Sequence, residues 1–96
     1  MTVYMLKPIF HRKAQKFLLK LPKKHKTQIA SKIQLLLENP LQNDVKQLRG
    51  KSASFLRADS GEYRIIFRVE SDFLYIDLIG KRNDNEIYKM LENFLN

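Results

Sequence analysis

The 96-residue sequence contains no cysteine. No disulfide can therefore stabilise the fold, and no thiolate can bind a metal or attack a substrate. No apolar run approaches the roughly 20 residues needed to cross a membrane, and the N-terminus lacks the basic-then-apolar order of a signal peptide. We therefore expect a soluble, cytoplasmic protein that has no membrane partner.

Several common catalytic chemistries also lack their residues. The chain has no Gly-rich phosphate loop, and its two histidines, His11 and His25, lie in Lys-rich helical segments without the spacing of a metal site. The carboxylates are scattered, so no pair can be assigned as general acid and general base. The sequence therefore predicts neither a metal nor another cofactor.

The composition nevertheless predicts a folded protein with a real core. Hydrophobic residues make up 44% of the chain, and ten residues are aromatic. The length suits one domain, which we place over residues 1–96. The net charge is +8, but residues 1–49 carry +9 and residues 50–96 carry −1. This uneven charge is typical of a nucleic-acid-binding protein, although a solvated Lys-rich helix surface or an acidic protein partner explains it equally well.

The first half of the chain predicts a short strand and a helical hairpin. Residues 2–6 are apolar and are interpreted as the first strand. Pro8 suits the first turn of a helix whose apolar positions, from Phe10 to Leu21, follow a helical period. Pro22 ends that helix and can begin a second one, which stops at residues 39–40. Two helices joined this closely should lie antiparallel and cover one face of a sheet.

The second half predicts an antiparallel meander and a final helix. Residues 63–69 alternate, so that Arg64 and Arg68 share one face of a strand and form a candidate anion site. Turn residues at 59–62 and 70–72 separate this strand from neighbours near residues 54–58 and 73–79. Asn83 and Glu86 have the spacing of a capping box that opens the last helix. The predicted fold is α+β, with the N-terminal strand and helical hairpin packed on a small, mainly antiparallel, twisted sheet.

Five short motifs occur in an order that resembles the RelE/ParE superfamily of bacterial type II toxins. They are Lys-Leu-Pro-Lys (residues 20–23), Glu-Asn-Pro (38–40), Leu-Arg-Gly (48–50), Gly-Glu-Tyr-Arg (61–64) and Gly-Lys-Arg (80–82), followed by Tyr88. Each motif alone is weak, but five in this order are specific, and the resemblance covers nearly the whole chain.

The resemblance implies an activity and a set of site residues. RelE-like members are metal-independent endoribonucleases, or mRNA interferases, that cleave mRNA on the 70S ribosome by attack of the RNA's own 2′-OH. Matching the motifs implies catalytic roles for Arg64, Arg82, Tyr88 and Arg57, of which Arg57 takes the place of the first of two basic residues on the preceding strand. It also implies RNA contacts from the other basic residues near these motifs: Arg49, Lys51, Lys81, Lys13, Lys16 and Lys20.

The resemblance leaves two questions open, one about a site residue and one about the function. Asp59 stands where the family usually has a Lys or Arg, and either Lys51 or Lys81 can supply the missing charge. The alternatives to an interferase are a ParE-like inhibitor of DNA gyrase and a noncatalytic basic binding module. The resemblance further implies a cognate antitoxin as partner, and contact with operator DNA only through that antitoxin.

Overall fold

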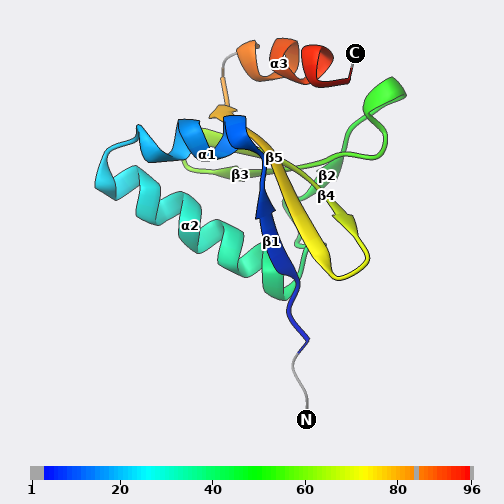
Figure 1. Cartoon of the computed structure of the whole chain (residues 1–96), viewed down its shortest axis with the longest axis horizontal. Coiled ribbons are helices and arrows are strands. Elements are labelled where there is room, and N and C mark those ends of the chain that lie inside the picture. Colours follow the sequence, from blue (N-terminus) through cyan, green and yellow to red (C-terminus); the bar gives the residue numbers. More distant parts are fainter. Residues whose placement is uncertain (1–3, 84, 96) are drawn as a thin grey trace.

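The computed structural model describes residues 4–83 and 85–95, which form three helices and a five-stranded sheet (Figure 1). In chain order the elements are β1 (Lys7–Phe10), α1 (Arg12–Leu19), α2 (Lys23–Glu38), β2 (Lys46–Gln47), the 3₁₀ turn η1 (Gly50–Ser52), β3 (Leu56–Ser60), β4 (Tyr63–Glu70), β5 (Phe73–Lys81) and α3 (Glu86–Leu95). The strand order is β1-β5-β4-β3-β2. Only β1 and β5 are parallel, so the α+β class and the antiparallel meander are confirmed.

The N-terminal strand lies later in the chain than predicted. It occupies Lys7–Phe10, whereas residues 4–6 are not in a strand and residues 2–3 lie outside the described residues. Pro8 therefore belongs to a strand rather than to a helix, which is possible because β1 is an edge strand and need not donate a hydrogen bond on its outer side. Helix α1 begins only at Arg12, where the Nδ1 atom of His11 accepts a hydrogen bond from the Lys13 amide at 3.1 Å.

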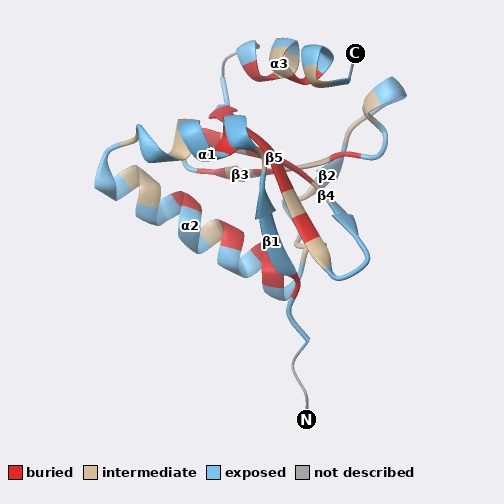
Figure 2. Ribbon diagram, in the orientation of Figure 1, coloured by how far each residue is buried: buried red, intermediate tan, exposed pale blue. Residues whose placement is uncertain are grey.

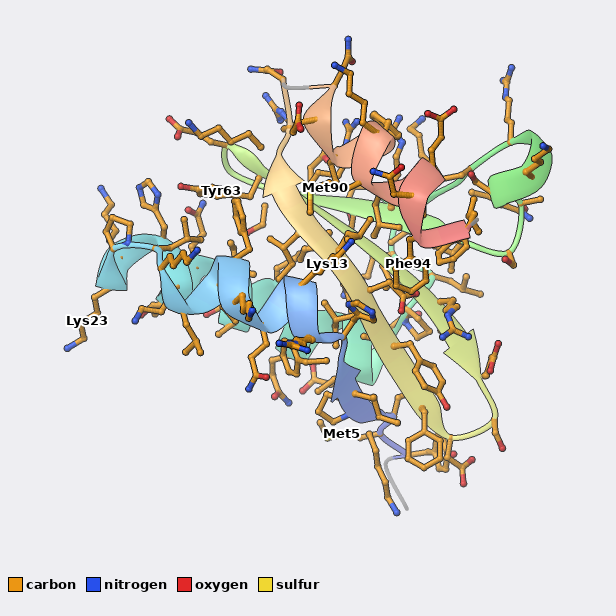
Figure 3. The ribbon with its side chains drawn as sticks, turned by 45° about the horizontal axis from the view of Figure 1, so that its top comes forward. Met5, Lys13, Lys23, Tyr63, Met90 and Phe94 are labelled. Atoms are coloured by element: carbon orange, nitrogen blue, oxygen red, sulfur yellow. The ribbon has the colours of Figure 1, made fainter. Side chains whose placement is uncertain are left out.

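Helices cover both faces of the sheet (Figure 2). The α1–α2 hairpin covers one face with a cluster that includes Ala14, Ile29 and Leu36 of the helices and Ile65 and Phe67 of β4. Helix α3 covers part of the other face, and Figure 3 shows Met90 and Phe94 directed from α3 towards the sheet. This second cluster contains Phe55, Ile66, Leu78, Ile87 and Leu91. The face of β4 that carries its arginines is therefore not an open surface, because Ile66 between them is fully buried.

The final helix also differs from its prediction. It begins at Glu86 rather than at Asn83, which lies in a turn, and its first turn is bonded to the Asn85 carbonyl. Leu95 in its last turn is 39% exposed. Because Gly80 has no side chain, β5 passes close beneath α3: a Cβ atom there would lie 3.1 Å from Ile87.

The β3–β4 turn is shorter than the sequence suggests. Asp59 and Ser60 belong to β3, so the turn consists of Gly61 and Glu62. Gly61 has a φ of +57°, a conformation that strains other residues. The strand pairs Asp59 directly with Arg64. The tight turn therefore places an acid beside the arginine that the sequence marks as functional.

We expect Asp44→Asn to lower stability more at about pH 7 than at about pH 3. Lys32 Nζ lies 2.8 Å from Asp44 Oδ2 and links α2 to the loop before β2. The hydrogen bond from Lys32 lowers the pKa of Asp44, so its contribution is complete above the unfolded pKa and is lost as the pH falls through the lower folded pKa. For a half-exposed carboxylate the loss should be at most about 1 kcal/mol, or a few degrees in Tm. Thermal unfolding at both pH values tests this, with exposed Glu92→Gln as control; an equal loss at both would contradict the prediction.

Candidate functional site

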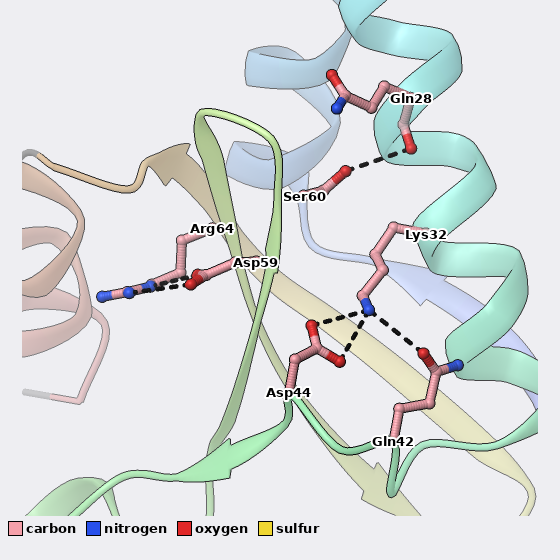
Figure 4. A network of polar contacts seen from close by, with 7 residues as sticks. All are labelled: Gln28, Lys32, Gln42, Asp44, Asp59, Ser60 and Arg64. Atoms are coloured by element: carbon pink, nitrogen blue, oxygen red, sulfur yellow. Dashed lines mark hydrogen bonds and ion pairs between the residues drawn. The ribbon is translucent and has the colours of Figure 1, made fainter.

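The centre of the candidate site is the contact of Arg64 with Asp59 and Tyr88. The Arg64 Nε atom donates to Asp59 Oδ1 at 2.8 Å, and its Nη2 atom donates more weakly to Oδ2 at 3.4 Å. Its Nη1 atom donates to the Tyr88 hydroxyl of α3 at 2.5 Å. Figure 4 shows Asp59 and Arg64 on the side of the hairpin that faces α3, whereas Ser60 points the other way, towards Gln28 of α2. Two strands and one helix thus fix a single guanidinium.

The electrostatics of this centre keep Arg64 charged. The hydrogen bond from Arg64 to Asp59 raises the pKa of the guanidinium, and this outweighs the opposing effect of burial. The Arg64 side chain is 13% exposed and that of Asp59 is 32% exposed. Asp59, which stands where the family usually has a basic residue, is thus bonded to Arg64 and occupies an edge of the guanidinium that a phosphate would otherwise bind.

Arg57 joins the centre on the same face of the sheet. It pairs with Ile66 of β4, which lies beneath α3, and with Lys46 of β2. Directly paired strand residues point to the same side, so Arg57, Arg64 and Lys46 share one face. Among the described residues no carboxylate pairs with Arg57 or Lys46. Sequence reasoning missed Lys46, because only the pairing of β2 with β3 places it beside Arg57.

Arg82 and Lys81 lie at the end of β5, but only Arg82 is placed near Arg64. The Arg82 amide donates to the Glu62 carbonyl at 2.8 Å. This bond places the exposed Arg82 beside the β3–β4 turn, where Glu62 precedes Arg64 by two residues. Lys81 pairs with Tyr63, whose ring packs against Phe17 under the α1–α2 hairpin. Lys81 therefore starts from the opposite face to Arg64 and is poorly placed to replace the missing charge of Asp59.

The remaining basic residues predicted to contact RNA lie further out. Arg49 and Lys51 are exposed at η1, where Lys51 and Ser52 line a shallow pocket of about 250 Å³ with Glu92 and Leu95 of α3. Lys13, Lys16 and Lys20 are exposed on or directly after α1, and Lys13 is labelled in Figure 3. These basic residues lie outside the Arg64 centre.

Arg68, the second arginine of the predicted anion site, is engaged elsewhere. Its Nε atom donates to Asp77 at 2.9 Å and its Nη1 atom to Glu70 at 2.8 Å, while its guanidinium lies 4.4 Å from the Tyr75 ring centre. Burial raises the pKa of Asp77, and the charge of Arg68 opposes that rise. The expectation that Arg64 and Arg68 form one anion site is therefore wrong: a bulge between Ile66 and Phe67 separates their surroundings.

The fold is similar to that of several solved proteins. The fold is similar to that of the toxin in the RelBE2 toxin–antitoxin complex of Mycobacterium tuberculosis, with a TM-score of 0.75 at 24% identity over 86% of this chain and 98% of that one. The archaeal RelE of the Pyrococcus horikoshii RelE–RelB complex gives 0.69 at 26% identity, over 85% and 98%. A double mutant of Escherichia coli RelE in the free state gives 0.77 at 21% identity, over 96% and 99%.

Residues 9–86 match the family described as the ParE toxin of the type II toxin–antitoxin system parDE. The chain therefore belongs to this family, within the RelE/ParE superfamily of type II toxins, and its fold is RelE-like. No curated protein matches the sequence significantly. Among the described residues no helix is long and apolar enough to cross a membrane.

A double-mutant cycle on Asp59→Asn and Arg64→Gln should reveal a coupling of about 1 kcal/mol in the free energy of unfolding. The pair is partly shielded from solvent and has charge-assisted geometry, which favours more than the few tenths of a kcal/mol typical of an exposed pair. Urea unfolding of the wild type, the two single variants and the double variant measures the coupling. Additive losses would show that the two side chains do not interact in solution.

Proposed function

We propose that this toxin is a metal-independent endoribonuclease that cleaves mRNA on the ribosome and so inhibits translation. The observation that carries the proposal is the contact between the Arg64 guanidinium and the Tyr88 hydroxyl, with Arg57 and Arg82 on either side. These are the four residues for which the sequence predicts catalytic roles. The proposal is therefore supported by the position of the four predicted residues in one region of the fold.

The chemistry requires charge and orientation from the protein. The RNA supplies the nucleophile, because its 2′-OH attacks the neighbouring phosphorus while the 5′-oxygen leaves; DNA has no such hydroxyl. Arg64 and Arg57 would bind the nonbridging oxygens and stabilise the negative charge that grows in the transition state. Arg82 would lie near the leaving oxygen as a fixed positive charge, since an arginine pKa above about 12 makes it a poor proton donor.

Tyr88 would orient the substrate. Its phenol is held by Arg64, and its half-buried ring is available for stacking on a base or for positioning the 2′-OH. A site without a poised histidine should be slow on free RNA. The proposal therefore includes a need for the ribosome, which would bend the message into line for attack.

The proposed partner is an antitoxin. The Mycobacterium tuberculosis and Pyrococcus horikoshii structures are of complexes with RelB antitoxins. An antitoxin segment that covers the basic face around Arg64 would inactivate this chain, and contact with operator DNA would come through that antitoxin.

The second candidate is a ParE-like inhibitor of DNA gyrase. Two observations favour it: the family match is to ParE, and Asp59 already occupies one edge of Arg64. A gyrase inhibitor needs no free phosphate-binding guanidinium. Variants of Arg82, which lies beside the β3–β4 turn, separate the two functions.

Arg82→Ala should abolish cleavage of cellular messages, with cut-site intensity reduced by at least about 100-fold, because it removes charge from the leaving side of the phosphate. Primer extension on messages after induction in bacteria measures the cuts, and exposed Arg12→Ala, on α1, is the matched control. Growth arrest by both variants without cuts, together with loss of gyrase supercoiling activity, would support the ParE-like alternative instead.

Asp59→Asn should increase cleavage several-fold, because it frees the Nε edge of Arg64 for a phosphate oxygen. Glu62→Gln is the control, since it removes the same charge from the neighbouring turn without touching Arg64. Cut-site intensities are compared at equal protein levels. A fall in cleavage with Asp59→Asn would mean that the carboxylate assists the reaction or its geometry.

A further inference from the structure

The edge of the sheet beside Arg57 holds a pair of like charges that the predicted catalytic set does not include. Lys46 of β2 pairs directly with Arg57 of β3. In an antiparallel pair the two side chains leave the sheet on the same side, with Cβ atoms about 5 Å apart. Like charges directly opposite each other destabilise a sheet. Neither cation is paired with a carboxylate among the described residues, so nothing in this part of the fold offsets the repulsion.

The backbone around Lys46 is fixed on both sides. Before it, the Val45 amide donates to the Gln42 carbonyl at 2.9 Å, and Asp44 is tied to Lys32 of α2 (Figure 4). After it, the Leu48 amide donates to the Phe55 carbonyl at 3.0 Å. The short strand β2 is therefore an anchored edge rather than a loose loop, and Lys46 extends into solvent from a defined position.

The neighbouring carboxylate compensates Arg64 but not this pair. Asp59 neutralises Arg64, whereas Arg57, two residues earlier on the same strand, has no such partner. Arg57 and Arg64 stand diagonally across β3 and β4, about 7 Å apart. A polyanionic strand that ran from Arg64 towards the β2 edge of the sheet would therefore meet Arg57 and Lys46.

We propose that Lys46 is a further phosphate-binding residue of this site and that Lys46 and Arg57 hold one phosphodiester of a single-stranded RNA between them. The inference rests on the proposed function, because it names how the same face grips its substrate. Lys46 supplies the positive charge that Asp59 removes from β3. The repulsion between the two cations becomes an attraction when an anion lies between them.

The test is binding of a short 2′-O-methylated RNA, which cannot be cleaved, to the purified chain by fluorescence anisotropy over a range of salt. Lys46→Ala should weaken binding about fivefold and reduce the slope of log affinity against log salt by about 0.7, the value for one phosphate contact on a single strand. Lys46→Arg should restore both. The matched control is Lys7→Ala, an exposed lysine on β1 at the opposite edge of the sheet, which should change neither.

Three outcomes would overturn the assignment of Lys46: no loss with Lys46→Ala, an equal loss with Lys7→Ala, or a double variant with Arg57→Ala whose losses are fully additive. A shared phosphate instead predicts that the double variant loses less than the sum. Failure of the proposed function is a separate result. If the wild type binds the RNA through Lys46 but cuts no message in bacteria, the nuclease proposal fails and the phosphate site stands.

Discussion

The candidate site depends on the pairing of Asp59 with Arg64 across β3 and β4. This pairing follows from the two-residue turn at Gly61 and Glu62, because a longer turn would move Asp59 out of register. It fixes the guanidinium where Tyr88 can accept its remaining hydrogen bond. The position of α3 matters because this helix carries Tyr88. The close approach of Ile87 to Gly80 sets that position.

A single carboxylate therefore changes how the basic face works. In a cluster of unpaired arginines the side chains would repel one another, and each would attract a phosphate equally. Here Asp59 holds one edge of Arg64, so in the proposed function Arg57, Arg82 and the lysine at the β2 edge would share the attraction of phosphate with it. The face combines a guanidinium held by two hydrogen-bond partners with basic residues that have no carboxylate partner among the described residues.

Much of this fold could be predicted from the sequence because its signals are local. The helical hairpin follows from apolar spacing and from Pro22, and the central meander follows from alternation around residues 63–69. The N-terminal strand was misplaced because the apolar residues 2–6 gave a stronger pattern than Lys7–Phe10, whose partner is a distant strand. Parallel pairing with β5 leaves no local trace in the sequence.

The site was predicted less completely, for reasons of register and bulges. The motifs identified Arg64, Arg82 and Tyr88, and the structure brings the first and last into contact. Alternation alone put Arg68 in the same site, but the bulge beside Ile66 gives it separate partners. Lys46 was missed because only the pairing of β2 with β3 places it beside Arg57.

The most direct measurement of the central claim is cleavage in a purified translation system. The toxin is added to ribosomes carrying a defined message, to the same message without ribosomes, and to a message with a single 2′-deoxynucleotide at the position otherwise cut. An interferase of the proposed mechanism cuts only the ribosome-bound message, and the single deoxynucleotide prevents the cut. Intact message in every reaction, or cutting that the deoxynucleotide does not block, would contradict the mechanism.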